Sequence, residues 1–299
     1  MSTYKAGFAG LIGEPNAGKS TLLNAILGEK LSIVSDKPQT TRRRVQGILT
    51  LPEAQIVFLD SPGILSATAG LNGFLASEAR SVASSADCLL VLVAGGDSEK
   101  HAQVAARVAR ESGRPWKMLV TKADLMGGDR GPKALGWIVQ EKIPFVSISA
   151  LKRPAEARDE AIRLIFEMLP AAEAPLFDED LYTTQTLREM TAEIVRERCF
   201  ESLRQEIPYG IAVRTTSFKE NDGDVVKIAC EIWVDKENHK AIVIGAKGAG
   251  LKKIGSESRI ELERLLERQV FIELRVVAKP GWAKNPRYMK ELGYVTAKK

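Results

Sequence analysis

The sequence predicts two domains, an α/β domain with a mostly parallel sheet covered by helices on both faces and a smaller α+β domain behind it. Three observations support this prediction. Short apolar runs alternate with amphipathic stretches through the first half of the chain, which is typical of strand-helix-strand units. The alternation stops near residue 170, and a different order of elements follows. The 299 residues also exceed the usual span of one hydrophobic core.

The first half contains five expected strands and five expected helices. The strands are predicted at residues 7–12, 55–59, 88–93, 117–120 and 144–148, and the helices at 19–27, 71–84, 99–111, 132–141 and 154–169. Because ligands of parallel sheets bind at the carboxyl ends of the strands, we expect a functional site at that edge.

Prolines and acidic residues replace the periodic pattern between Pro170 and Asp180, which predicts a linker at 173–183 between domains at 1–172 and 184–299. The second domain should begin with a helix over 186–206. A hairpin of strands 212–218 and 225–234 follows, with its turn at 220–224. A helix from about residue 236, a helix over 251–268 and a strand over 270–277 complete it.

The composition limits the class of protein. No window approaches the roughly 18 apolar residues of a membrane span, and the N-terminus lacks the pattern of a secretory signal, so we expect a soluble, cytoplasmic protein. Cys88, Cys199 and Cys230 are isolated, which excludes a disulfide framework and a thiolate zinc site as expectations.

The net charge of +5 is concentrated in the second half of the chain. Residues 1–180 carry 21 Lys and Arg against 21 Asp and Glu, whereas residues 181–299 carry 22 against 17. A basic half favours a polyanionic partner, and an ordinary solvated surface is the alternative.

A phosphate-binding loop is predicted at residues 13–20, where the pattern G-x-x-x-x-G-K-S follows a strand and precedes a helix. Gly13 and Gly18 let backbone N–H groups face the phosphates, Lys19 reaches the outer phosphates, and Ser20 supplies a hydroxyl to Mg²⁺. The predicted phosphate-binding residues are Gly13, Glu14, Pro15, Asn16, Ala17, Gly18, Lys19, Ser20, Thr21, Asp60 and Gly63.

Three further motifs follow later strands and indicate GTP. Asp60 in the segment DSPG supplies a carboxylate to the magnesium shell through water, and the backbone of Gly63 approaches the γ-phosphate. Asp124 can accept from N1–H and N2–H₂ of guanine, whereas adenine would leave it unpaired. The predicted guanine-binding residues are Thr121, Lys122, Asp124, Ser149, Ala150 and Leu151.

The polar segment 39–44 lies where a GTPase needs a threonine that senses the γ-phosphate through Mg²⁺. Thr41 is the predicted ligand, with Thr40 in reserve, and the arginines at 42–44 are either functional or a solvated loop. Lys19, Thr41 and Gly63 are therefore the predicted catalytic residues, and Ser20, Thr41 and Asp60 the predicted Mg²⁺ site. Ile64 stands where some GTPases have a water-orienting glutamine, so slow intrinsic turnover is expected.

A glycine-rich turn, Gly245 to Gly248, joins two predicted helices in the second half. No acidic residue occurs from Asn238 through Ser256, so the turn lies in a locally positive segment. This pattern favours salt-dependent RNA binding. The predicted RNA-binding residues are Lys240, Gly245, Ala246, Lys247, Gly248, Lys252 and Lys253. Trp282 either packs or stacks on a base.

Taken together, GEPNAGKSTLLN, QTTRRR, DSPG, TKAD, IVIGAKGAGLKKIGSESR and GWAKNPRYMKELGY resemble motifs of the Era family of bacterial ribosome-associated GTPases. The resemblance implies an α/β P-loop GTPase domain followed by a smaller α+β type II KH domain. Such a protein binds GTP and GDP, and its KH domain binds small-subunit ribosomal RNA near the 3′ end during assembly of the small ribosomal subunit.

The resemblance also suggests a K⁺ ion near Asn16 beside Mg²⁺, and a monomer. Thr121 departs from the usual asparagine, which removes a bracing amide and could weaken nucleotide binding. Two other readings stay open, an RNA-binding scaffold that uses GTP mainly as a structural ligand and a GTPase of a membrane or transport process. Peripheral association with the inner face of the cell membrane also stays open.

Overall fold

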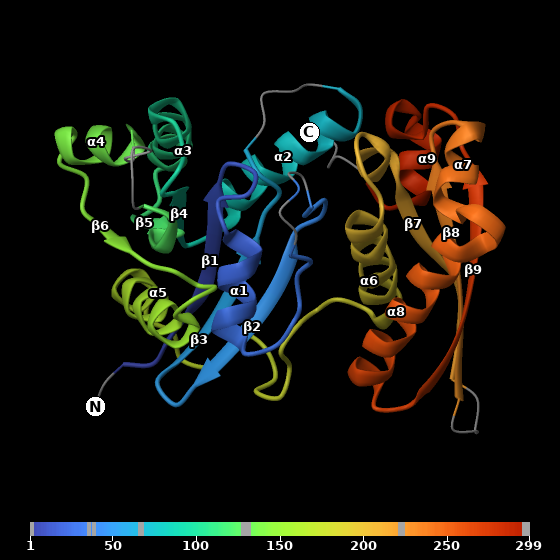
Figure 1. The fold of residues 1–299 in the computed structure, drawn as a ribbon. Helices are drawn as coiled ribbons and strands as arrows, with labels where there is room; N and C mark the ends of the chain where they lie inside the picture. The colour runs from blue at the N-terminus through green and yellow to red at the C-terminus, as the bar shows by residue number, and fades with distance from the viewer. Residues whose placement is uncertain are drawn as a thin grey trace. The chain divides into compact units, whose positions relative to one another are not determined.

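The computed structural model describes residues 3–34, 37, 40–64, 69–126, 133–220 and 225–294 (Figure 1). It contains two compact units. The first comprises Met1–Thr68 with Asn72–Thr184, and the second comprises Ala69–Leu71 with Gln185–Lys299.

The first unit is built on a six-stranded sheet in which only one edge strand is antiparallel. The other neighbouring strands pair in parallel, which confirms the predicted mostly parallel sheet. In spatial order the strands are β2 (Val45–Leu51), β3 (Ala54–Asp60), β1 (Lys5–Gly13), β4 (Cys88–Ala94), β5 (Trp116–Thr121) and β6 (Phe145–Ser147).

Helices cover both faces of this sheet (Figure 1). Alanines at helical spacing on α3 let that helix pack closely on the strands, in one cluster with α2 and α4. The opposite face carries α1 and α5, which contact each other. The helices are α1 (Lys19–Leu27), α2 (Gly70–Ser85), α3 (Glu99–Ser112), α4 (Lys133–Gln140) and α5 (Pro154–Met168).

Strand β2 is absent from the sequence prediction. Gly47 and two polar residues, Gln46 and Thr50, interrupt its apolar pattern, so the periodicity is weak. The strand forms because it pairs with β3 through seven residues, from Val45 opposite Asp60 to Leu51 opposite Ala54. Pro132, the predicted start of α4, lies outside the described residues.

The segment predicted as a linker is bonded to strands β3 and β2 of this sheet. The buried side chain of Gln55 on β3 accepts from the backbone N–H groups of Leu176 and Phe177 at 2.7 and 2.8 Å. Its amide donates to the Phe177 carbonyl at 3.0 Å. Farther along, the N–H of Ile48 on β2 donates to the Tyr182 carbonyl at 2.9 Å. Residues 176–182 therefore follow β3 and then β2.

The second unit has a three-stranded sheet in the order β7–β8–β9, with β7 antiparallel and β9 parallel to β8. The antiparallel pair confirms the predicted hairpin, whose turn residues 221–224 lie outside the described residues. Three helices share a core with this sheet. The elements are α6 (Leu187–Ser202), β7 (Ala212–Lys219), β8 (Val225–Val234), α7 (Glu237–Ile244), α8 (Ala249–Leu266) and β9 (Gln269–Ala278).

Helix α6 ends earlier than predicted. It begins with a capping box, in which the side chains of Thr186 and Glu189 bond to each other's backbone N–H. It stops at Ser202, because Leu203 is extended with a φ of −105° and a ψ of 157°. Gln205 then has a positive φ of 56°, and Ile207–Gly210 forms the 3₁₀ turn η2.

The tail contains two unpredicted elements, the 3₁₀ turn η4 (Trp282–Lys284) and the helix α9 (Pro286–Glu291). Trp282 is 0% exposed, and its indole N–H donates to the Gly210 carbonyl at 2.8 Å. Trp282 therefore packs, and the alternative that it stacks on a base is wrong. No helix among the described residues is both long and apolar enough to span a bilayer.

Candidate functional site

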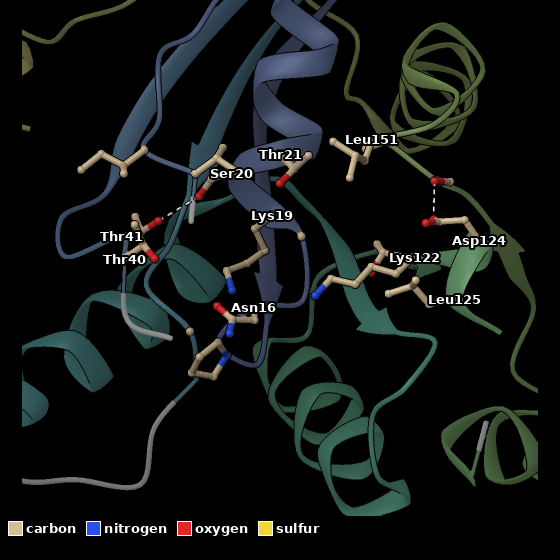
Figure 2. Close-up of a pocket in the computed structure, with 18 of the residues that line it drawn as sticks. Asn16, Lys19, Ser20, Thr21, Thr40, Thr41, Lys122, Asp124, Leu125 and Leu151 are labelled. Carbon is tan, nitrogen blue, oxygen red and sulfur yellow. Dashed lines mark hydrogen bonds between the residues drawn. The ribbon is translucent and has the colours of Figure 1, made fainter. Parts of the chain in front are cut away.

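The carboxyl edge of the first sheet holds a cavity of about 460 Å³ that is lined by residues of the predicted nucleotide motifs. Figure 2 shows Lys19, Ser20, Thr21 and Thr41 toward one side of this cavity and Lys122, Asp124, Leu125 and Leu151 toward the other. Gly13, Glu14, Ala17 and Asp60 lie outside the lining, but each bonds to a residue in it, as described below.

The loop between β1 and α1 is shaped by backbone conformations that few residues adopt. Asn16 has a φ of 63°, and Gly18, with a φ of 87°, precedes the first residue of α1. Lys19 turns back over the loop, and its ammonium group donates to the carbonyls of Gly13 at 3.1 Å and Glu14 at 2.9 Å. The loop is thus closed around a positive charge at the N-terminus of a helix, which suits a phosphate group.

Ser20, Thr41 and Asp60 converge at the phosphate end of the cavity. The Ser20 hydroxyl donates to Oδ2 of Asp60 at 2.7 Å and lies 2.8 Å from the Thr41 hydroxyl (Figure 2). Asp60 is fully buried, and its Oδ1 has no hydrogen-bond partner among the described residues. Two hydroxyls and a carboxylate with an unused oxygen form the hard oxygen set that Mg²⁺ prefers, so these residues fit the ion.

The reserve candidate, Thr40, has a different environment from Thr41. Its hydroxyl donates to the Lys37 carbonyl at 2.7 Å. Of the neighbouring arginines, Arg42 is only 2% exposed, so the interpretation of this run as a solvated loop fails at that position. Arg44 is exposed.

The DSPG segment touches the phosphate loop directly. A Cβ added to Gly63 would lie 2.3 Å from the backbone nitrogen of Pro15, a distance that no side chain can occupy. The Ser61 hydroxyl donates to the Leu11 carbonyl at 2.8 Å, and the Ile64 N–H donates to the Gly13 carbonyl at 3.0 Å. Glycine is therefore required at position 63 by close backbone approach. Residues 65–68 of the following loop lie outside the described residues.

Asp124 and Ser149 form the base end of the cavity. The Ser149 hydroxyl donates to Oδ1 of Asp124 at 2.5 Å (Figure 2), and this hydrogen bond lowers the pKa of the Asp124 carboxyl below its ordinary value. Asp124 is therefore ionised at neutral pH and can accept two N–H groups from a base. Leu151 is 76% and Leu125 64% exposed, so each offers apolar surface to a ring.

Thr121 braces the site despite the missing amide. Its hydroxyl donates to the Ala17 carbonyl of the phosphate loop at 2.7 Å, with a longer contact of 3.4 Å to the Val93 carbonyl at the end of β4. The predicted weakening of nucleotide binding stays a prediction, because this bond concerns the loop and not the nucleotide. A hydroxyl in place of the amide still joins the base motif to the phosphate loop.

In the second unit, the turn between α7 and α8 keeps glycine at two strained positions. Gly245 has a φ of 73°, and a Cβ there would lie 2.8 Å from the backbone nitrogen of Gly250. Gly248 has a φ of 82° with open space beside it. Lys247, Lys252 and Lys253 are exposed, and Lys240 pairs with Glu237 at 2.7 Å. A bare backbone turn beside exposed ammonium groups suits a sugar-phosphate chain.

Comparisons with known proteins agree with both units. A family model described as a 50S ribosome-binding GTPase matches residues 8–122, and a KH domain model matches residues 206–282. GTPase Era of Geobacter metallireducens is 41% identical over 295 residues, covering 97% of this chain and 98% of that protein. GTPase Era of Ruminiclostridium cellulolyticum is 37% identical over 303 residues and covers 99% of both.

The chain belongs to the Era family of GTPases.

Two solved Era structures share the fold of this Era-family GTPase. A variant of Aquifex aeolicus Era bound to GDP and AlF4⁻ has a TM-score of 0.89 at 37% identity. Era in complex with MgGDPNP and nucleotides 1506–1542 of 16S ribosomal RNA has a TM-score of 0.90 at 38% identity. Each covers 98% of this chain and 100% of its own. The chain is accordingly a GTP-hydrolysing enzyme with a P-loop GTPase domain and a KH domain.

Sequence reasoning missed three apolar residues in the cavity of this Era-family GTPase. Ile33, Val34 and Leu125 line it beside the predicted polar residues. Isolated apolar residues in loops form no recognisable motif. The sequence signal for a place in the cavity was position alone, because Leu125 directly follows TKAD and Ile33 and Val34 lie in the segment after α1. Among the described residues, no three His, Cys, Asp or Glu side chains gather into a metal-binding group.

We expect nucleotide binding by this Era-family GTPase to depend on pH through Lys19. Burial lowers the pKa of Lys19 to about 8, although the Asp60 carboxylate acts in the opposite direction. Phosphates favour the charged ammonium, so GDP binding should take up a proton once Lys19 begins to titrate. GDP affinity should then fall about fourfold between pH 7 and pH 8.5. Calorimetry in buffers of different ionisation enthalpy measures this uptake, and binding without proton uptake at pH 8.5 would contradict it.

Proposed function

We propose that this GTPase is a switch whose nucleotide state governs when its KH domain holds or releases small-subunit ribosomal RNA near the 3′ end. Its place of action would be assembly of the small ribosomal subunit in the cytoplasm. The observation that carries the proposal is one cavity with Ser20 and Thr41 at one end, where Ser20 is bonded to Asp60, and Asp124 at the other. The bound state of the similar Era protein, with MgGDPNP and 16S ribosomal RNA, supports the choice of RNA.

Hydrolysis proceeds by in-line attack of water on the γ-phosphate, and the protein contributes mainly position and charge. Lys19 offers its ammonium to the phosphate oxygens from the place where Gly13 and Glu14 hold it. Thr41 and the backbone at Gly63 hold the γ-phosphate side of the site. Mg²⁺, bound by Ser20 and Thr41 and through water by Asp60, supplies neutralising charge to the phosphate oxygens. Asp124 reads guanine, with Lys122 and Leu151 beside the base.

Intrinsic turnover is slow in this proposal because Ile64 cannot orient the attacking water. A partner that orders the segments around Thr41 and Gly63 would raise the rate. Multiple-turnover hydrolysis measured with and without small ribosomal subunits tests this, and a fast rate for the isolated protein would defeat it.

Potassium is a subsidiary proposal. The left-handed backbone at Asn16 lies in the phosphate loop, and Asn16 lines the cavity. An amide oxygen there suits a monovalent cation beside the phosphates. Equal hydrolysis rates in matched Na⁺ and K⁺ buffers would remove K⁺ from the mechanism.

The RNA contact is assigned to the turn from Gly245 to Gly248 with Lys240, Lys247, Lys252 and Lys253. Replacing Gly248 with aspartate should abolish RNA binding, because a carboxylate would stand where phosphate lies, while GDP affinity stays unchanged. Gel shift with a small-subunit 3′ RNA fragment measures the first property and fluorescent GDP titration the second.

Gly113→Asp is the matched control for this variant. Gly113 also has a positive φ, 68°, and no atom within 4 Å of an added Cβ, but it belongs to the first unit. The Gly113→Asp variant should therefore bind RNA as the unchanged protein does. Retained RNA binding by Gly248→Asp would reject the assignment of this turn.

The role in assembly of the small ribosomal subunit and the location of the protein in the cell need separate experiments. Crosslinking the protein to RNA in cells should enrich reads at the 3′ end of small-subunit ribosomal RNA, and reads scattered without ribosomal enrichment would overturn the assembly role.

We further propose a monomer with domains at 1–172 and 184–299 joined by residues 173–183. Sedimentation tests the monomer, and cell fractionation tests peripheral attachment to the inner face of the membrane.

A further inference from the structure

The outer edge of strand β2 is covered by the chain segment 176–184, which leads to the second unit. β2 is an edge strand of the six-stranded sheet, so alternate backbone groups point away from β3. The Ile48 N–H donates to the Tyr182 carbonyl at 2.9 Å, and Gly47 forms an antiparallel bridge with Thr183. The segment is therefore bonded to β2 as a short additional strand would be.

Gln46 on β2 holds the last two residues of this segment. The Thr183 hydroxyl donates to the backbone carbonyl of Gln46 at 2.8 Å. The Thr184 hydroxyl donates to the side-chain oxygen of Gln46 at 2.7 Å. One residue of the strand thus holds two consecutive residues that lie 137 and 138 positions later in the chain.

Gln46 also lies close, along the chain, to the phosphate end of the cavity. β2 begins at Val45, which is paired with Asp60. Thr41 precedes Val45 by four residues, and its hydroxyl lies 2.8 Å from that of Ser20. Five residues reach at most about 17 Å when fully extended, so the chain from Thr41 to Gln46 has little slack. A displacement of Thr41 should therefore change the position of Gln46.

The connection from Gln46 to the second unit is equally short. Only Gln185 separates Thr184 from Thr186, the residue that caps helix α6. This cap is a capping box with Glu189, which fixes the first turn of the helix. The bond between Gln46 and Thr184 therefore restrains the chain at the point where the second unit begins.

The other end of the segment has a firmer attachment. Gln55 is 0% exposed, and its side chain bonds to the backbone of Leu176 and Phe177. Thr184 is exposed instead, so water can replace its bond to Gln46 and opening that bond costs little. The segment thus has one buried anchor toward the far end of β2 and one exposed attachment at the end near the cavity.

We propose that Gln46 couples the nucleotide site to the second unit by holding or releasing Thr184. This inference rests on the proposed function, in which Thr41 holds the γ-phosphate side of the site. GTP and GDP then differ in what they offer to Thr41, and a ligand needs such a difference in order to shift a conformational equilibrium. Movement at Thr41 changes the bond at Gln46, and the nucleotide state reaches α6 along the edge of β2.

The test compares the RNA affinity of the full chain loaded with GDP or with GDPNP. Its probe is a labelled RNA with the 3′-terminal sequence of small-subunit ribosomal RNA, followed by fluorescence anisotropy. In the unchanged protein the two affinities should differ by about 5- to 150-fold, the usual range of coupling between sites. Gln46→Leu removes the acceptor of the Thr184 hydroxyl and should reduce this ratio to about one.

Variants at both ends of the bond separate its loss from other effects of substitution. Gln46→Glu keeps an oxygen that accepts from the Thr184 hydroxyl, so it should retain the ratio. Thr184→Val removes the donor and should lose the ratio. Combining Thr184→Val with Gln46→Leu should cause no further loss, because both changes break the same bond.

Gln103→Leu is the matched control. Gln103 lies on α3, and its side chain donates to Glu99 at 2.8 Å, so a glutamine bond of similar length is lost outside the segment 176–184. The Gln103→Leu variant should keep the ratio of the unchanged protein. Loss of the ratio in this control as well would reject a specific role of Gln46.

The GDP affinity of Gln46→Leu without RNA separates coupling from support of the fold. It should equal that of the unchanged protein, and a marked loss would show that Gln46 merely stabilises the first unit. If the unchanged protein binds the RNA equally with GDP and GDPNP, the proposed switch fails and the role of Gln46 fails with it. If the unchanged protein distinguishes the nucleotides and Gln46→Leu does so equally, only the role of Gln46 is rejected.

Discussion

Replacing Asp124 with asparagine should lower the affinity for GTP by about 10⁴-fold, because the carboxylate that accepts two guanine N–H groups is lost and an amide N–H₂ faces them instead. The same change should create binding of xanthosine triphosphate, whose base carries a carbonyl oxygen where guanine carries its amino group. Competition against a fluorescent nucleotide measures both affinities.

Asp159→Asn is the control for this exchange, since Asp159 lies exposed on α5 and outside the cavity. It should bind both nucleotides as the unchanged protein does. The assignment of Asp124 as the guanine reader would be abandoned if its asparagine variant bound GTP normally.

Replacing Gly63 with alanine should slow single-turnover GTP hydrolysis by about 100-fold or more. The added Cβ would lie 2.3 Å from the nitrogen and 2.6 Å from the Cα of Pro15, and both atoms are backbone. One of the two loops must therefore shift, and a displacement of about 1 Å at a reacting centre costs about 10² in rate. GDP affinity should change much less, because GDP lacks the γ-phosphate that Gly63 approaches.

Gly96→Ala is the matched control, because a Cβ at Gly96 meets no atom within 4 Å. Its hydrolysis rate should stay within twofold of the unchanged protein. A similar rate for Gly63→Ala would show that close contact between the two loops does not matter for hydrolysis.

The nucleotide motifs are predictable from sequence because each is local. A phosphate loop needs its glycines, lysine and serine within eight residues, and the strand before it and the helix after it are legible as apolar patterns. Their common location follows from topology, since the carboxyl ends of parallel strands lie at one edge. The order of the motifs therefore predicted which residues would share a cavity.

Strand β2 and the tail elements could not be predicted from local sequence patterns. The apolar pattern of β2 is interrupted at Gly47, and the strand exists because β3 offers it a partner. The sequence predicts Trp282 as a packing residue, with stacking on a base as the alternative. Its burial and its bond to Gly210 decide for packing.

The sequence by itself determined the fold class and the choice of GTP, and it predicted the residues that handle phosphate and magnesium. Only the tertiary structure decided that Thr121 braces Ala17 and that Gly63 lies against Pro15. These pairs are separated by tens of residues, and their contact depends on how strands and loops pack. Spacing along a chain specifies which residues a motif contains, whereas packing specifies which atoms meet.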